Sequence, residues 1–338
     1  MSAKVAVLGS GSWGTAFAAV VARNGVPTTL WARRTDAAQE IELRHTNESY
    51  LPGIELPAML GATTDMQEAV HQAELVVMGV PSDGFRDRCQ EVAPMLKPDA
   101  VLVSLCKGIE RASGRRMSQV AAEAAGLPAE RVAVISGPNL AKEVARGLPG
   151  ATVAASVSEE TARKVQALCH APTFRVYTNT DVIGVEVGGA VKNIAAIAAG
   201  VADGYGYGEN ALSALVTRGL VEITRLGVAL GANPITFVGL AGVGDLVATC
   251  MSKLSRNHHV GEELSKGRRL DDIIQSMNQV AEGVKSCGAI LETAAELGVE
   301  MPIAERVGKV LYEGADVKDM VDSLLTRDPE TEFRGIPN

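Results

Sequence analysis

The feature that most constrains the fold is a glycine-rich hexapeptide near the N-terminus, GSGSWG at residues 9–14. It directly follows the apolar run Val5–Leu8 and precedes a stretch of helical composition. In this strand–turn–helix context G-x-G-x-x-G is the dinucleotide fingerprint: Gly9 permits a tight turn, Gly11 lets a pyrophosphate approach the backbone, and Gly14 allows close helix packing. The helix N-terminus then offers N–H groups to the phosphates. The alternative is a structural turn without a ligand.

The rest of the first half repeats this alternation of short apolar runs and helical stretches. The runs are continuously apolar, which is typical of strands buried on both faces of a parallel sheet. The regular strand–helix order predicts an α/β fold with an N-terminal Rossmann-like doubly wound sheet. The expected strands are Val5–Leu8, Thr28–Ala32, Leu75–Val80, Val101–Leu105, Val132–Ile135, Ala151–Val157 and Phe174–Tyr177.

Past about Gly184 the strand runs end, and long alanine- and leucine-rich stretches predict an all-helical C-terminal domain. We therefore expect a dinucleotide-binding domain at 1–184, a helical substrate and catalytic domain at 185–330, and a polar tail at 331–338. The expected helices are Val185–Val201, Ala211–Leu226, Asn257–Ser265, Asp271–Met277, Ser286–Leu297, Ile303–Tyr312 and Val317–Leu325.

Composition narrows the class of partner. Lysine and arginine total 32 against 40 acidic residues, a net charge of −8, and aromatics are 4% of the chain. Nucleic-acid-binding proteins need a basic face and stacking rings, so nucleic acid is not an expected partner. The longest apolar runs, such as Ile194–Ala202, fall short of the ~18 residues of a membrane span, so no integral membrane segment is expected.

The cysteines indicate the compartment. There are five, widely spaced and without a C-x-x-C pair, which is typical of reduced thiols rather than of a disulfide framework. The few residues before the first expected strand leave no room for a signal peptide. We therefore expect a cytoplasmic protein. The histidines and cysteines also lack metal-ligand spacing, so no metal site is predicted.

The end of the second expected strand bears on the choice of cofactor. An NAD-preferring site places an acidic residue there for the ribose 2′-hydroxyl. This chain has Arg33 and Arg34, whose guanidinium groups suit a 2′-phosphate, and this favours NADP(H). The alternative is a solvated arginine pair with Asp36 taking the hydroxyl, which leaves NAD(H) open.

Several cations and turns have positions suited to chemistry. Lys107 and the turn containing Gly137 and Asn139 each follow an expected strand, where ligands gather in open α/β sheets. Lys192 lies on an expected helix that is otherwise almost free of charge. Burial there would lower its pKa towards neutrality, which suits proton transfer. The alternative is a lysine that reaches solvent from the helix end.

Two clusters lie further along the chain. The glycine-rich turn at 239–244 leads into Asp245, and Ser255, Arg256 and Asn257 present a hydroxyl, a guanidinium and an amide in succession. Such a trio can begin a helix and hold a phosphate. Taken alone, either cluster could be an ordinary helix cap.

Taken together, these segments resemble the bacterial-type NAD(P)-dependent glycerol-3-phosphate dehydrogenases over nearly the whole chain. Their order and spacing are more specific than any single motif. The resemblance rests on Gly9–Gly14, Arg23–Gly25, Leu51-Pro52, Lys107-Gly108, Val134–Pro138, Ala141–Glu143, Phe174–Tyr177, Gly188–Asn193, Gly244–Leu246, Ser255–Asn257 and Glu282-Gly283.

The resemblance implies roles for individual residues. Lys192 matches the catalytic lysine, which exchanges a proton with the C2 oxygen, and Asp245 matches the acid beside it. Asn139 departs from the Thr or Ser common in the family, although its amide can still donate a hydrogen bond. Substrate-contacting positions are Lys107, Gly137, Asn139, Lys192, Asp245, Ser255, Arg256 and Asn257. Cofactor-contacting positions are Gly9, Gly11, Ser12, Trp13, Gly14, Arg33, Arg34, Tyr50, Lys107, Ala141, Arg256, Val280 and Glu282.

The implied activity interconverts dihydroxyacetone phosphate and glycerol 3-phosphate, which supplies phospholipid synthesis, and the implied assembly is a homodimer. The expected partner is thus a small anionic phosphate substrate. One alternative is a related two-domain reductase of another small keto or hydroxy acid, which need not bind phosphate. A non-catalytic NADP sensor is a different class of answer. The presence of both Lys192 and the Ser255–Asn257 trio argues against a sensor.

Overall fold

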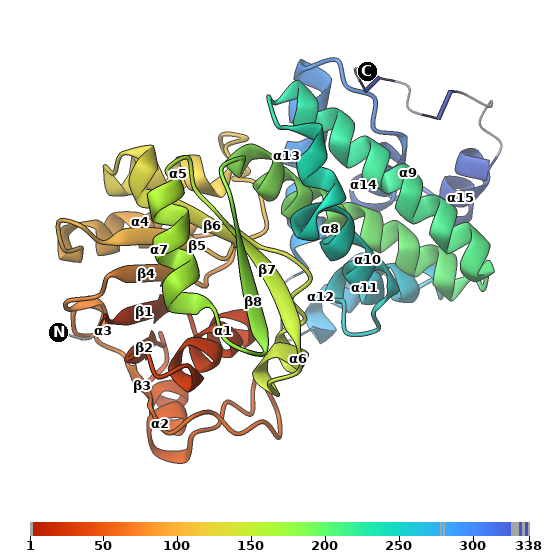
Figure 1. Cartoon of the computed structure of the whole chain (residues 1–338). Coiled ribbons are helices and arrows are strands. Elements are labelled where there is room, and N and C mark those ends of the chain that lie inside the picture. Colours follow the sequence, from red (N-terminus) through yellow and green to blue (C-terminus); the bar gives the residue numbers. More distant parts are fainter. Residues whose placement is uncertain (1–2, 278, 280, 326–330, 333–334, 337–338) are drawn as a thin grey trace. The chain divides into compact units, whose positions relative to one another are not determined.

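The computed structural model describes residues 3–277, 279, 281–325, 331–332 and 335–336. The chain forms two compact units (Figure 1). The first comprises Met1–Cys106 and Met117–Val182, and the second comprises Lys107–Arg116 and Ile183–Asn338. A short segment of the N-terminal half therefore belongs to the second unit, which a simple division of the chain into two halves does not anticipate.

The first unit is built on an eight-stranded sheet of order β3-β2-β1-β4-β5-β6-β7-β8 (Figure 1). The order of the first six strands is that of a Rossmann fold, which confirms the predicted fold class. Strands β1 to β6 are mutually parallel, whereas β7 runs antiparallel to β6 and β8 parallel to β7. The strands are β1 (Val5–Leu8), β2 (Thr28–Trp31), β3 (Leu60–Thr63), β4 (Leu75–Met78), β5 (Val101–Ser104), β6 (Val132–Ser136), β7 (Gly150–Ala155) and β8 (Phe174–Asn179).

Three details of the sheet differ from the expectation. Strand β3 is absent from the predicted set, because its sequence LGAT has one buried residue and resembles a loop. The antiparallel β7 departs from an all-parallel sheet. Strand β8 alternates buried Phe174 and Val176 with exposed Arg175 and Tyr177, so it is a half-buried edge strand and not one covered on both faces.

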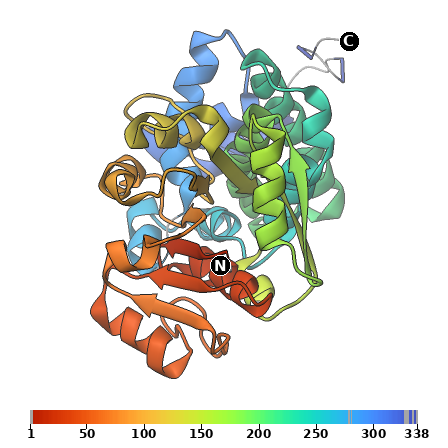
Figure 2. The ribbon, with the colours of Figure 1, turned by 60° about the vertical axis from the view of Figure 1, so that its left-hand side comes forward.

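Helices cover both faces of this sheet (Figure 2). Alternate residues of a strand point to opposite faces, so they pack into two different hydrophobic cores. Val5 and Val7 pack into the core that includes Phe17, whereas Ala6 and Leu8 pack into the core that includes Phe85. The first face carries α1 (Ser12–Arg23), α2 (Thr35–Arg44), α6 (Ala141–Ala145) and α7 (Glu159–Cys169). The second carries α3 (Met66–Val70), α4 (Phe85–Val92) and α5 (Met117–Ala125).

The second unit is helical, as predicted. Its longest helix is α8 (Val182–Gly204). This helix is longer than the apolar runs noted in the sequence, and by length and composition it could cross a membrane. The apolar window of α8 is 94% buried inside the protein, which is the environment of a core helix. The other helices are α9 (Gly208–Ala229), α10 (Asp245–Met251), α11 (Arg256–Ser265), α12 (Leu270–Ser276), α13 (Glu282–Glu296), α14 (Pro302–Glu313) and α15 (Val317–Leu325).

Glycines let neighbouring backbones approach α8 closely. A Cβ added at Gly188 would lie 2.4 Å from the carbonyl oxygen of Ala241, and one at Gly200 would lie 2.0 Å from that of His258. Both distances are far below normal contact, so only glycine fits. This packing fixes α8 against the π-helical turn Leu240–Gly244 and against α11, and it thereby positions Lys192.

Candidate functional site

The glycine-rich loop lies at the point where the strand order reverses, between β1 and β4. Gly9 has φ +121°, and a Cβ there would lie 2.5 Å from the carbonyl oxygen of Gly79. A Cβ at Gly14 would lie 2.1 Å from the carbonyl oxygen of Gly9. Gly79, which follows β4, completes this close packing. Sequence analysis assigned Gly79 no such role, because it belongs to no motif.

Gly11 has a different environment. It is the N-cap of α1 without a side-chain hydrogen bond, and nothing lies within 4 Å of an added Cβ. The space beside Gly11, at the first turn of α1, is therefore open. A helix N-terminus with that opening fits the pyrophosphate of a dinucleotide.

A second loop fastens this turn. The Ser12 hydroxyl donates to the carbonyl oxygen of Tyr50 (2.9 Å). The side-chain amide of Asn47, 1% exposed, donates to the Ser10 carbonyl oxygen and to the Thr15 hydroxyl, each at 2.9 Å. Asn47 was missed by sequence analysis, because an isolated asparagine in a polar stretch carries no signal.

Other residues predicted to contact the cofactor lie around the same unit. The Trp13 ring meets Phe17 edge-on, with ring centroids 5.9 Å apart. Arg33 and Arg34 are exposed directly after β2. The Arg34 guanidinium lies 3.4 Å from the Asp36 carboxylate, so the arginine and the acid that sequence analysis weighed against each other form a surface ion pair.

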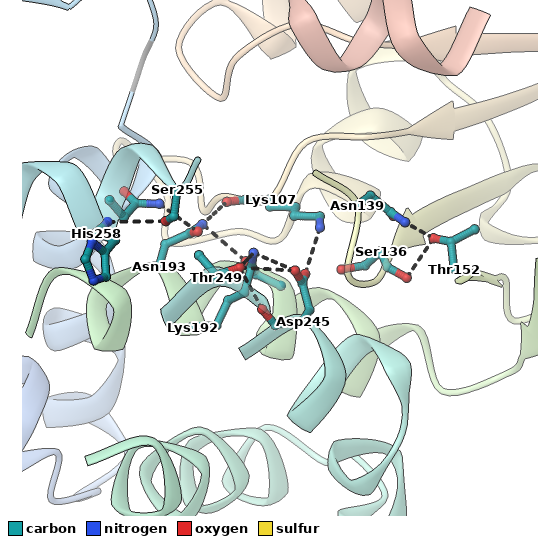
Figure 3. Close-up of polar contacts among 12 residues, drawn as sticks. Lys107, Ser136, Asn139, Thr152, Lys192, Asn193, Asp245, Thr249, Ser255 and His258 are labelled. Atoms are coloured by element: carbon teal, nitrogen blue, oxygen red, sulfur yellow. Dashed lines mark hydrogen bonds and ion pairs between the residues drawn. The ribbon is translucent and has the colours of Figure 1, made fainter. Parts of the chain in front are cut away.

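The turn after β6 is packed against β7. Gly137 has φ +155°, and a Cβ there would lie 3.0 Å from Thr152 Cα. The amide nitrogen of Asn139 donates to the Ala151 carbonyl oxygen (3.1 Å), and its oxygen accepts from the Thr152 hydroxyl (2.9 Å; Figure 3). The Asn139 side chain thus anchors this turn, which leads into α6 at Ala141.

The second unit brings two predicted lysines onto one carboxylate (Figure 3). Lys192 Nζ lies 2.7 Å from Asp245 Oδ1, and Lys107 Nζ lies 2.7 Å from Asp245 Oδ2. The side chains of Lys192, Asp245 and Lys107 are 6%, 2% and 16% exposed. Lys192 also donates to the Thr249 hydroxyl (2.5 Å), which in turn donates to the Asp245 carbonyl oxygen (2.6 Å).

Among Lys192, Lys107 and Asp245, two lysines share one carboxylate. Burial lowers the pKa of Lys107 to about 8. Asp245 acts against this shift, while Lys192 and Arg256 add to it. A buried site with surplus positive charge gains most from binding an anion, so the cluster suits a phosphorylated ligand.

Amide groups hold the backbone of the cluster in place. Asn193 Nδ2 donates to the Lys107 and Gly189 carbonyl oxygens, each at 3.2 Å. Asn257 Nδ2 donates to Asn193 Oδ1 (2.8 Å), and Asn257 Oδ1 accepts from Gly283 N (3.0 Å). The Asn257 amide thus supports Asn193, a residue to which sequence analysis gave no role of its own.

The start of α11 combines a cap with a cation. The Ser255 hydroxyl accepts from His258 N (3.2 Å), so Ser255 is a helix cap as the alternative interpretation proposed. Burial lowers the pKa of Arg256, and Glu282 acts against that shift. Glu282 begins α13, whereas Val280 lies outside the described residues.

Two family models and several known proteins are similar to this chain. Models of the N- and C-terminal parts of NAD-dependent glycerol-3-phosphate dehydrogenase match residues 4–162 and 181–322. The chain is 51% identical to glycerol-3-phosphate dehydrogenase [NAD(P)+] of Streptomyces griseus, over 98% of each chain. It is 53% identical to that of a Parafrankia strain, over 98% of this chain and 99% of the relative. A crystal structure of glycerol-3-phosphate dehydrogenase from Coxiella burnetii is similar, with TM-score 0.91, 37% identity and coverage of 96% and 99%.

Proposed function

This chain belongs to the NAD-dependent glycerol-3-phosphate dehydrogenase family, and on that premise we propose that it interconverts dihydroxyacetone phosphate and sn-glycerol 3-phosphate. The observation that carries the proposal is the pair of lysines on Asp245, each with its Nζ 2.7 Å from a carboxylate oxygen. This arrangement offers both a proton and an anion-binding charge within one buried cluster.

The reduction of a ketone needs a hydride at carbon and a proton at oxygen. When bound, a nicotinamide cofactor supplies the hydride. Lys192 donates the proton to the C2 oxygen, and its charge stabilises the alkoxide that develops there. Asp245 and the Thr249 hydroxyl hold the Lys192 ammonium in one orientation through their hydrogen bonds.

We assign binding of the substrate phosphate to the cations of this cluster. Lys107 and Arg256 attract the phosphate, and the N-terminus of α11 contributes its dipole. Ser255 and Asn257 hold the backbone of the helical unit at this cluster through a helix cap and an amide hydrogen bond. We also assign Gly137 and Asn139 to the substrate; the φ angle of Gly137 and the hydrogen bonds of Asn139 fix the turn after β6. Phosphate binding places C2 for reaction.

The relatives are named for use of NAD(P)+, and we propose that this chain favours NADP(H). Support comes from Arg33 and Arg34, which are exposed at the end of β2, where a 2′-phosphate would lie. Arg33→Asp should weaken NADPH binding more than NADH binding, as measured by fluorescence titration. Arg175→Asp, at an exposed position of β8, is the matched control and should change the affinity for neither cofactor. Equal weakening of both cofactors by Arg33→Asp would remove the 2′-phosphate argument.

The reaction itself is tested with purified protein. We expect NADPH oxidation with dihydroxyacetone phosphate and little with unphosphorylated keto acids, which lack the group that Lys107 and Arg256 attract. Turnover of keto acids alone would favour the related reductase. Cofactor binding without turnover of any such substrate would favour a sensor.

We further propose a homodimer that works in the cytoplasm and supplies glycerol 3-phosphate for phospholipids. The five cysteines are free thiols, which is the usual state of cysteines in the cytoplasm.

Growth of a strain lacking this protein should require glycerol or glycerol 3-phosphate. Sedimentation equilibrium should give twice the chain mass of 35.3 kDa.

A further inference from the structure

The segment Lys107–Arg116 follows β5 in sequence, yet it is part of the helical unit. It folds back on itself, because Glu110 N donates to the Arg115 carbonyl oxygen (2.9 Å) and Ile109 pairs with Arg116 in an antiparallel bridge. Ile109 is 6% exposed and lies in the hydrophobic core of the helical unit. We call this segment the inserted hairpin.

The inserted hairpin is held at both ends by the helices that carry the lysine cluster. At its first residue, the Lys107 ammonium binds Asp245 of α10, and its carbonyl oxygen accepts from Asn193 of α8. At its last residue, Arg116 Nη1 lies 2.5 Å from Glu186 Oε2, also on α8. Glu186 precedes Lys192 on the same helix, roughly 9 Å along the axis at ~1.5 Å per residue.

The ion pair between Glu186 and Arg116 is largely buried, with side chains 5% and 15% exposed. Burying both charges carries a large desolvation penalty, and an apolar pair of similar volume is often as stable. A guanidinium on a carboxylate is, however, directional and fixes the geometry of the groups that carry it. The proposed proton transfer and phosphate binding use neither residue.

We propose that the Glu186–Arg116 ion pair is a positioning device, which fixes the inserted hairpin on α8 and thereby places the Lys107 ammonium at Asp245. Two residues at opposite ends of one short hairpin then serve one purpose, Lys107 as the substrate-binding group and Arg116 as its support. The kinetic part of this inference rests on the proposed function, whereas its structural part does not.

The test uses Glu186→Gln and Arg116→Gln in the full-length protein, with Arg116→Lys as a milder variant that keeps the charge. We expect KM for dihydroxyacetone phosphate to rise on the order of tenfold, with kcat reduced less. Because the two residues act as a pair, the effects of the two single variants should not add in the double variant. Amide hydrogen exchange at Glu110 and Gly114 should become faster in each variant.

A matched control is Glu263→Gln, which breaks the ion pair of Glu263 with Arg268 in the same unit but outside the inserted hairpin. It should lower thermal stability and leave KM and exchange in the hairpin unchanged. Unchanged exchange at Glu110 and Gly114 in the Glu186 and Arg116 variants would overturn the proposal, as would a fall in kcat as large as the rise in KM. If the wild type does not reduce dihydroxyacetone phosphate, the proposed function fails, and hydrogen exchange alone decides the role of the ion pair.

Discussion

At the scale of single residues, we propose that Lys107 sets the pH dependence of substrate binding. Burial among Lys192 and Arg256 lowers its pKa to about 8, although Asp245 acts in the opposite direction. Below that pH Lys107 is an ammonium that attracts phosphate, and above it the residue becomes a neutral amine. The affinity for a phosphorylated substrate therefore falls as pH rises through the pKa.

We predict that kcat/KM for dihydroxyacetone phosphate declines above about pH 8, approaching roughly tenfold per unit, because this ratio reports titration of the free enzyme. Lys107→Met should have a much lower kcat/KM at neutral pH, and its kcat/KM should not decline above about pH 8. Steady-state kinetics from pH 6.5 to 9.5 provide the measurement. If Lys107→Met keeps the same decline, another group of the cluster causes it.

Sequence and structure differ in which residues of the cluster they reveal. A lysine in an apolar helix is conspicuous, and the resemblance paired Lys192 with Asp245. Thr249 carries no such signal, because a threonine four residues after an aspartate is common on helices. Its contact with Lys192 depends on how α8 and α10 pack, and a linear pattern does not contain that information.

At the scale of elements, the crossing of α8 and α11 depends on glycine at Gly200 and Gly261. A Cβ at Gly261 would lie 2.0 Å from the Ile197 carbonyl oxygen, just as one at Gly200 would meet that of His258. Backbone cannot yield as a flexible side chain can. The helix pair must therefore separate to admit even one methyl group.

We predict that Gly200→Ala lowers the free energy of unfolding by about 1–3 kcal/mol or more, the usual cost of overpacking. Gly288→Ala on α13 is the control, because its Cβ would meet Tyr312 at 3.8 Å, an ordinary contact. It should be neutral or stabilising by about 0.5–1 kcal/mol, since alanine favours helix. Urea unfolding of both variants tests this. If the two variants had the same free energy of unfolding, α8 and α11 would be shown to separate without loss of stability.

The elements that could be predicted from sequence are those whose signal is local. Four strands rich in Val, Ile and Leu stand out, as do the long helices; these strands are β1, β4, β5 and β6. By contrast, α13 begins at Glu282 and not at the expected Ser286, because Asn257 on another helix accepts from Gly283 N. The residues at 240–244, expected as a glycine-rich turn, form a π-helical turn that continues into α10. Both differences come from tertiary contacts.

At the scale of the whole molecule, the proposed function assigns a different part of the chemistry to each unit. The sheet unit provides the glycine loop and α1 for a dinucleotide, and the helical unit provides two lysines on Asp245. No shift in composition marks Lys107–Arg116 as part of the helical unit, so its placement could not be predicted from sequence. The chain has a net charge of −8, and yet two buried lysines share the single carboxylate of Asp245.

The central claim is that the full-length protein catalyses hydride transfer from NADPH to dihydroxyacetone phosphate, and that Lys192 supplies the proton. The most direct measurement is the amount of glycerol 3-phosphate formed per NADPH consumed, in the wild type and in Lys192→Met. We predict equal amounts in the wild type and a rate about 10²- to 10⁴-fold lower in Lys192→Met, with NADPH affinity unchanged. NADPH consumption without glycerol 3-phosphate, or a wild-type rate in Lys192→Met, would contradict the account.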